Sequence, residues 1–99
     1  MDTTYETSFG RFEWDSEKEA INLRKHGLDF KLAADVFADP FALFLCDDLH
    51  SHGEERMIVI GEVGAMVLLF VVFTERDAIR IISARKAVRA EVKRYEESR

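Results

Sequence analysis

The chain of 99 residues contains a single cysteine, a single proline and no long hydrophobic run. Cys46 therefore cannot form an internal disulfide. The longest apolar stretch, residues 63–73, is too short for a membrane-spanning helix, which needs about 20 residues. No secretory signal sequence is recognisable after Met1. We therefore expect a reduced, cytoplasmic protein with no membrane segment.

Several common functional motifs are also missing from the sequence. There is no glycine-rich phosphate loop, no dinucleotide-binding fingerprint and no nucleophile elbow, so the enzyme classes that depend on these motifs are not indicated. Internal repeats and low-complexity tracts are absent as well. An isoelectric point of about 5.2 argues against indiscriminate nucleic-acid binding, although a local basic surface remains compatible with it.

The sequence does contain enough apolar residues, 47 %, to form one compact core. The first eleven residues have few apolar side chains and no clear period, so we expect residues 1–11 to form a loose leader. Residues 12–99 are then expected to form a single domain.

Two helices are expected first. Asp15 or Ser16 can cap a helix over residues 16–26, and Gly27 follows as its stop signal. Asp29 can cap a second, short helix that ends before Asp39 and Pro40. The side of the first helix expected to pack carries Ala20, Ile21 and Leu23.

Continuous apolar segments follow the helices and predict strands. These segments are FALFLC, MIVI, MVLLFVVF and AIRII, with hairpin turns expected at residues 61–64 and 75–77. A closing helix is expected over residues 84–97, with Ala84, Val88, Val92 and Tyr95 on its packed side. The pattern predicts an α+β fold with two N-terminal helices, a four-stranded, mainly antiparallel sheet and a C-terminal helix.

Positive charge is concentrated near the end of this acidic chain. Residues 76–94 contain seven Arg or Lys and two acids, whereas the preceding 75 residues contain six bases and fifteen acids. Guanidinium groups bind phosphate oxygens through paired donors, so this segment could hold an RNA or DNA backbone. The alternatives are a solvated helix face and an arginine paired with a carboxylate on a strand. The candidate binding residues are Arg80, Arg85, Lys86 and Arg89.

A second candidate is the loop DDLHSHGEER, residues 47–56. His50 can give or take protons near neutral pH, and Glu54 could act as a base if its pKa were raised. The loop also contains Arg56, which could hold phosphate. Two alternatives are a solvated polar loop and a metal site built on His50 and His52, for which no standard ligand spacing is present.

The segment RKHG, residues 24–27, places His26 at the expected end of the first helix. A basic residue before glycine is also what helix capping alone would favour.

The segments FEWDSEKEAINLRKHGLDF, DDLHSHGEERMIVIG and TERDAIRIISARKAVRAEVKRYEE together resemble the BrnT family of bacterial toxins from type II toxin–antitoxin pairs. The resemblance covers about residues 12–97, and its most specific parts are INLRKHG, GEER-x-x-x-IG and RIISARKA. It implies a RelE-like fold and a metal-independent, cofactor-free ribonuclease that stops translation. The implied partner is a BrnA-type antitoxin with a DNA-binding ribbon-helix-helix domain, and the resemblance also allows a higher-order toxin–antitoxin assembly.

An RNase mechanism of this kind assigns roles to the candidates. Arg56 and Arg85 would hold the phosphate, while Glu54 or His50 would transfer protons and His26 is a further catalytic candidate. Arg80 would position the backbone or orient Glu54. The RNA-binding set is completed by Lys86 and Arg89. Two other functions stay open, because similar toxins instead inhibit DNA gyrase and an inactive member could simply bind its antitoxin.

Overall fold

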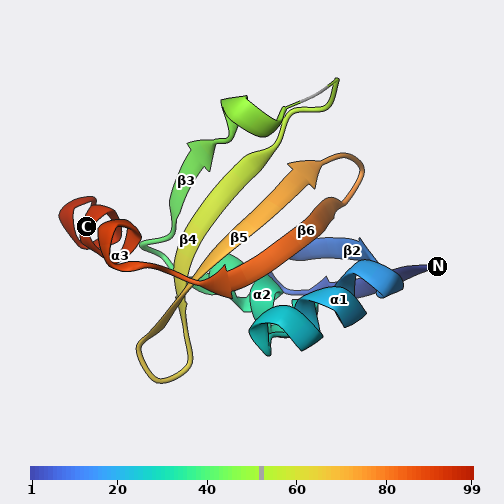
Figure 1. Cartoon of the computed structure of the whole chain (residues 1–99), viewed down its shortest axis with the longest axis horizontal. Coiled ribbons are helices and arrows are strands. Elements are labelled where there is room, and N and C mark those ends of the chain that lie inside the picture. The colour runs from blue at the N-terminus through green and yellow to red at the C-terminus, as the bar shows by residue number, and fades with distance from the viewer. Residues whose placement is uncertain (52) are drawn as a thin grey trace.

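The computed structural model describes residues 1–51 and 53–99. Within that part, one mixed sheet has the strand order β1-β2-β6-β5-β4-β3 (Figure 1). The strands are β1 (Asp2–Thr7), β2 (Gly10–Asp15), β3 (Leu43–Cys46), β4 (Met57–Val63), β5 (Val67–Glu75) and β6 (Ile79–Lys86). The helices are α1 (Ser16–His26), α2 (Phe30–Ala34) and α3 (Arg89–Glu97), with short 3-10 turns η1 (Asp35–Ala38) and η2 (Asp48–His50). None of the described helices is long and apolar enough to cross a membrane.

The expected four-stranded, mainly antiparallel fold is wrong in two respects. The sheet has six strands, because residues 1–11 are not a loose leader: β1 and β2 form an antiparallel hairpin that precedes both helices. The sheet is also mixed, because β2 pairs with β6 in parallel. The hairpin was missed because β1 alternates exposed and half-buried residues and buries no large side chain of its own, so its sequence has little apolar signal.

The two expected helices form with the expected caps, but they follow the β1–β2 hairpin and are not the first elements of the fold, as had been expected. The Asp15 carboxylate accepts a hydrogen bond from the Glu17 N–H at 2.9 Å, and the Asp29 carboxylate accepts one from the Leu32 N–H at 2.8 Å. Gly27 ends α1 with a left-handed φ of 71°, a conformation that glycine adopts without steric cost.

The way α1 packs differs from the expectation. Ile21 and Leu23 are about half exposed, and the buried residue of α1 is Asn22. The Asn22 amide donates to the carbonyl oxygens of Leu28 and Ala84, and its oxygen accepts from the Ala84 N–H, all at 2.9–3.0 Å. These bonds satisfy the N–H and the carbonyl group of Ala84 at the edge of β6. Helix α1 is therefore fixed to the sheet by a polar residue rather than by an apolar stripe.

The main core lies between the helices and one face of the sheet, which we call the helical face. Trp14 and Phe12 of β2 contribute to it, together with Phe30 of α2 and alternate residues of the central strands. Gly61 lies inside β4 rather than in the expected turn. A Cβ at this position would lie 3.0 Å from Val36, so glycine lets η1 approach the strand closely.

The opposite face of the sheet, which we call the open face, is only partly covered. Phe70 and Val72 of β5 and Ile58 of β4 are half-buried there, alternating with fully buried residues of the helical face. Helix α3 packs against β4 and lies at the far side of the sheet from the N-terminal hairpin (Figure 1). The remaining part of the open face is accessible to a ligand.

A β-bulge in β6 decides which of its side chains reach the open face. Val72 is opposite Ser83 and Phe73 is opposite Ile81, so Ile82 is the extra residue. Without it, Arg80 and Arg85 would point to opposite faces, because side chains alternate along a strand. The bulge places both arginines on the open face.

The C-terminal helix is shorter than expected, because β6 continues to Lys86 and α3 begins at Arg89. Ala84 and Arg85 pair with Val71 and Phe70, and this strand pairing overrides their helical spacing. Of the four residues expected on the packed side of the helix, Tyr95 is the one that α3 buries. The Tyr95 hydroxyl donates to the Asp39 carboxylate at 2.5 Å, which ties α3 to the segment before β3.

Candidate functional site

A cleft of about 340 Å³ lies on the open face, where the η2 loop overhangs β4, β5 and β6. It brings together three of the residues selected from the sequence, namely His50, Arg56 and Arg85, which come from η2, the residue just before β4 and the end of β6. Its floor is apolar. The other lining residues are Asp47, Ile58, Phe70, Val72 and Ser83.

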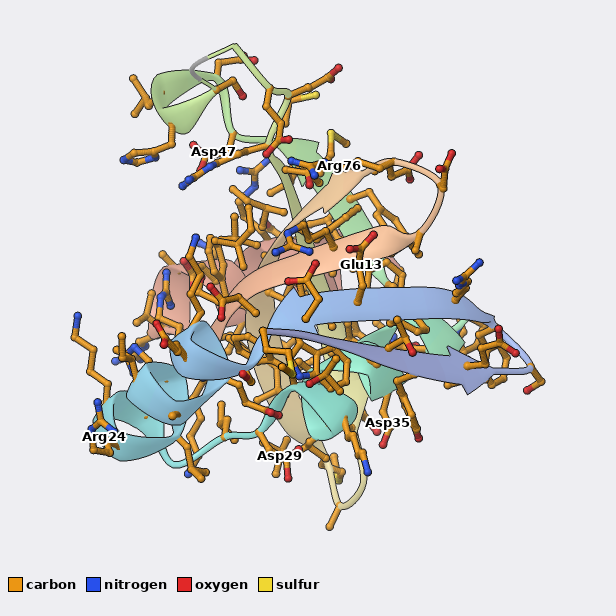
Figure 2. All side chains as sticks on the ribbon, turned by 90° about the vertical axis from the view of Figure 1, so that its right-hand side faces the viewer. Glu13, Arg24, Asp29, Asp35, Asp47 and Arg76 are labelled. Atoms are coloured by element: carbon orange, nitrogen blue, oxygen red, sulfur yellow. The ribbon has the colours of Figure 1, made fainter. Side chains whose placement is uncertain are left out.

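His50 is paired with a carboxylate at the rim of this cleft. The His50 Nδ1 lies 3.0 and 3.1 Å from the two carboxylate oxygens of Asp47. The Asp47 side chain is 13 % exposed, whereas the His50 side chain is 64 % exposed. Figure 2 shows Asp47 close to the η2 turn, at the opposite end of the view from Arg24 of α1. A carboxylate at Nδ1 favours the tautomer with Nε2 free to accept a proton.

The loop that carries this pair is closed by three hydrogen bonds. The Asp47 N–H donates to the Arg56 carbonyl oxygen at 2.9 Å, and the Arg56 N–H donates to the Ser51 hydroxyl at 2.9 Å. The Ser51 hydroxyl in turn donates to the Asp47 carbonyl oxygen at 2.7 Å. These bonds hold the backbones of Asp47 and Arg56 side by side. The His50 imidazole and the Arg56 side chain are therefore both anchored by the same closed loop.

Arg85 is oriented by a carboxylate and an aromatic ring. Its Nη1 and Nη2 each donate to one oxygen of Glu91 at 2.8 Å, and its Cζ lies 4.0 Å from the centre of the Phe70 ring. The hydrogen bonds from Arg85 lower the pKa of Glu91 despite its burial and raise the pKa of Arg85. A guanidinium has five N–H donors. Three are used here, counting a 3.2 Å bond to the Lys86 carbonyl oxygen, so two remain for a ligand.

Arg56 differs from Arg85 in its charge partners. Within residues 1–51 and 53–99, no carboxylate lies within ion-pair distance of the Arg56 side chain. The side chain is half-buried against the cleft. Arg56 therefore supplies a positive charge that is not neutralised by a direct contact.

Two sequence-predicted residues are held elsewhere. Glu54 forms an ion pair with Arg76 in the turn between β5 and β6, and it borders a separate hollow with Glu55, Met57 and Glu75. The expectation that Arg80 orients Glu54 is wrong. Arg80 instead donates to Glu13 at 2.7 Å and to Asp2 at 3.1 and 3.2 Å, as the alternative of a strand arginine paired with a carboxylate had predicted.

The remaining three candidates also lie outside the lining of the cleft. His26 borders a groove between α1 and β6. Lys86 borders a mostly apolar hollow beside the β4–β5 turn, and Arg89 is the exposed first residue of α3. The charges that a continuous helix would have placed on one face are therefore divided between a strand and a helix.

The metal interpretation of the loop finds no support in the described residues. Among them, no three His, Cys, Asp or Glu side chains lie close enough together to hold a metal ion. His52, on which that interpretation partly depended, lies outside the described residues.

Sequence reasoning did not select Asp47 and Ser83 as functional residues. A signal for Asp47 was available, since the spacing Asp47-x-x-His50 places the two side chains together in a single helical turn. Ser83 reaches the cleft only because of the bulge at Ile82, for which the sequence has no recognisable signal.

Comparison with known proteins identifies the family of this chain. Residues 14–91 match the family model described as the ribonuclease toxin BrnT of type II toxin–antitoxin systems. The crystal structure of the Brucella abortus ribonuclease toxin BrnT is 30% identical and superimposes with a TM-score of 0.60, covering 77% of this chain and 94% of that one. No curated protein matches the chain. Because the family model covers most of the sequence, the chain belongs to the BrnT family of ribonuclease toxins, which act in type II toxin–antitoxin systems with a cognate antitoxin.

Proposed function

We propose that this protein is an endoribonuclease that cleaves single-stranded RNA in the cleft formed by His50, Arg56 and Arg85. The observation that carries the proposal is the convergence of one oriented imidazole and two guanidinium groups from distant segments on an accessible face. Proton transfer and phosphate binding are the two requirements of RNA transesterification. Membership of a ribonuclease family supports RNA as the substrate.

In the proposed reaction, the neutral His50 imidazole removes the proton of the ribose 2′-hydroxyl through Nε2. The Asp47 carboxylate accepts the Nδ1 hydrogen bond and stabilises the imidazolium that forms. The 2′-oxygen attacks the adjacent phosphorus, and the bond from phosphorus to the 5′-oxygen breaks. The products are a 2′,3′-cyclic phosphate and a 5′-hydroxyl, whose proton comes from solvent in the open cleft.

Arg56 and Arg85 stabilise the additional negative charge on the phosphate oxygens in the transition state. Arg85 is held in place by Glu91 and Phe70, so it costs little reorganisation when the substrate binds. Arg56 contributes the net positive charge of the pair, because the charge of Arg85 is balanced by Glu91. None of these steps needs a metal ion, so we expect cleavage to continue in EDTA.

The biological role follows from the proposed activity. We infer that RNA cleavage stops translation in the cytoplasm and that a BrnA-type antitoxin with a ribbon-helix-helix domain neutralises the toxin. Co-purification of a tagged toxin with the product of the adjacent reading frame tests the partnership. Recovery of a neighbour without a ribbon-helix-helix domain would contradict that identity.

A cleavage assay tests the activity. Purified toxin, freed of antitoxin, is mixed with a labelled single-stranded RNA in EDTA, and the product ends are identified by mass spectrometry. We expect 2′,3′-cyclic phosphate ends, and a loss of rate of about 100-fold or more for His50→Ala and for Arg56→Ala.

The matched control is Arg24→Ala, which removes an exposed charge of α1 outside the cleft. Its cleavage rate should equal that of the wild type. Intact RNA together with inhibited DNA supercoiling would replace the nuclease proposal with gyrase inhibition. Intact RNA together with harmless expression would indicate an inactive antitoxin-binding protein.

A further inference from the structure

A second groove lies next to the cleft, between α1 and β6. We call it the α1 groove, and its volume is about 170 Å³. Its walls combine three basic side chains of α1 with apolar surface from both elements. The lining residues are Lys18, Ile21, Asn22, Lys25, His26, Ile82 and Ser83.

The basic side chains of the α1 groove are available to a ligand. Lys18 and Lys25 are seven residues apart, or about two helical turns, so they lie on the same side of α1. In the described part of the chain, no carboxylate lies within ion-pair distance of Lys18, Lys25 or His26. All three are exposed, although the protein has a net charge of −5. The α1 groove is therefore a local positive surface on an acidic protein.

The α1 groove and the cleft share one lining residue. Ser83 borders both hollows. The extra residue of the bulge, Ile82, lines the α1 groove, and the next residue begins the open-face row that continues to Arg85. A chain bound in the cleft would therefore meet the α1 groove at Ser83.

We propose that the α1 groove is a subsite for the RNA nucleotides next to the cleaved bond. Lys18 and Lys25 bind phosphate as mobile point charges, which requires no particular base sequence. Ile21 is 52 % exposed and, with Ile82, offers apolar surface to a ribose or base. His26 then has a binding role here rather than a catalytic one. This inference rests on the proposed nuclease function, because that function supplies the strand that reaches Ser83.

The occupant fits single-stranded RNA better than protein for a physical reason. Successive phosphates give a regular negative charge that matches two lysines on one side of a helix. The RNA strand would also lead directly from the proposed site of cleavage to this groove. An acidic antitoxin segment would share the charge, but its binding would not require the α1 groove to meet the cleft at Ser83.

The test compares Lys18→Ala/Lys25→Ala with the matched control Arg24→Ala/Lys31→Ala, whose two charges lie outside the α1 groove. The probes are fluorescent, fully 2′-O-methylated oligonucleotides of about two and eight nucleotides, which cannot be cleaved by 2′-oxygen attack. Binding is measured by fluorescence anisotropy over a series of KCl concentrations. We expect the groove variant to bind the longer probe about tenfold more weakly. Its salt slope should fall by about 1.4, or about 0.7 for each lost phosphate contact.

The short probe and the control variant should keep their wild-type affinities. Equal weakening in both double variants would overturn the proposal, because it would show a general charge effect. Unchanged binding of the longer probe, or a loss of antitoxin affinity alone, would overturn it as well. The nuclease function is judged separately by cleavage with the wild-type protein: tight, groove-dependent binding without cleavage would defeat that function and leave the subsite supported.

Discussion

Arg80 and Arg85 lie on the same strand and the same face of the sheet, yet their surroundings differ. The Arg80 side chain is 21 % exposed and contacts two carboxylates, those of Asp2 and Glu13. The Arg85 side chain is 35 % exposed, contacts one carboxylate, and borders the cleft. The single positive charge of Arg80 faces two negative charges, whereas that of Arg85 faces one. A second positive charge, that of Arg56, lines the same cleft as Arg85.

The difference shows that residue type alone does not assign function on this sheet. Arg80 joins the N-terminal hairpin to β6, because its partners come from β1 and β2. Arg85 is held against Phe70 with part of its donor set unused. Both side chains use three of their five N–H donors, so the difference lies in charge: a cation matched by two carboxylates acts as a connector, while one matched by a single carboxylate beside a cleft can bind an anion.

Cleavage rates provide the strongest test of this contrast. We expect Arg85→Ala to lower the rate about 100- to 1,000-fold, because a preorganised donor to the transition-state phosphate is lost. Arg80→Ala should change the rate only a few-fold when the protein is folded. Initial rates at saturating RNA, with circular dichroism as the check of folding, decide the matter. Equal losses for the two variants would break the comparison.

Stability should respond in the opposite order. Arg80→Ala leaves Glu13 half-buried without its hydrogen-bonded partner, and hydrogen bonds to charged groups contribute about 1.5–3 kcal/mol. We expect a loss of that size in the free energy of unfolding, measured with urea. Asp2→Asn is the milder control, because the Asp2 side chain is 56 % exposed and Arg80 keeps Glu13. If Asp2→Asn costs as much as Arg80→Ala, the hairpin connection depends on Asp2 alone.

The sequence predicts the parts of this fold that have strong local signals. The caps of α1 and α2 and the last four strands, β3 to β6, were predictable, because capping residues and apolar runs are read from neighbouring positions. The hairpin at the N-terminus was not, because β1 is held largely by pairing with β2. The start of α3 was also misplaced, since Arg85 and Lys86 pair with β5.

The candidate site was predictable in its residues more than in its geometry. His50, Arg56 and Arg85 were selected from chemistry, and their meeting in one cleft depends on β4 lying beside β5 and β5 beside β6. From the sequence, Glu54 is an equally good candidate for proton transfer, but its ion pair with Arg76 holds it on another surface. The bulge at Ile82 adds a single residue to β6, and this extra residue changes the face of the sheet on which the following side chains lie. Such a change leaves no pattern in the sequence.

The attachment of α3 affects Arg85 indirectly, because α3 carries Glu91. Burial and the Asp39 hydrogen bond raise the pKa of Tyr95 to about 12 from an ordinary value of 10.0. The neutral phenol therefore contributes stability that is fully present below pH 10 and lost as the pH rises through 12. Tyr95→Phe should cost about 1 kcal/mol at neutral pH. Its unfolding free energy should also fall less between pH 10 and 12 than that of the wild type, as measured with urea at each pH. Parallel curves would exclude the Tyr95 hydroxyl as the source of the alkaline loss.

The smallest effect should come from removing the charge that balances Arg85. Glu91→Gln keeps an acceptor near the Arg85 guanidinium but leaves the charge of Arg85 unbalanced. RNA affinity should therefore rise by a few-fold. The gain should be larger at low salt, because it is electrostatic. The hydrogen bonds from Arg85 lower the pKa of Glu91 from 4.5, so this carboxylate contributes stability above about pH 4.5 that is lost as the pH falls through its folded pKa. The variant should therefore lose less stability than the wild type on acidification. Anisotropy with an uncleavable RNA and urea unfolding at low pH measure the two effects. Unchanged or weaker RNA binding would mean that Glu91 matters to Arg85 by fixing its position, and the Arg85 guanidinium would then act through geometry rather than through net charge.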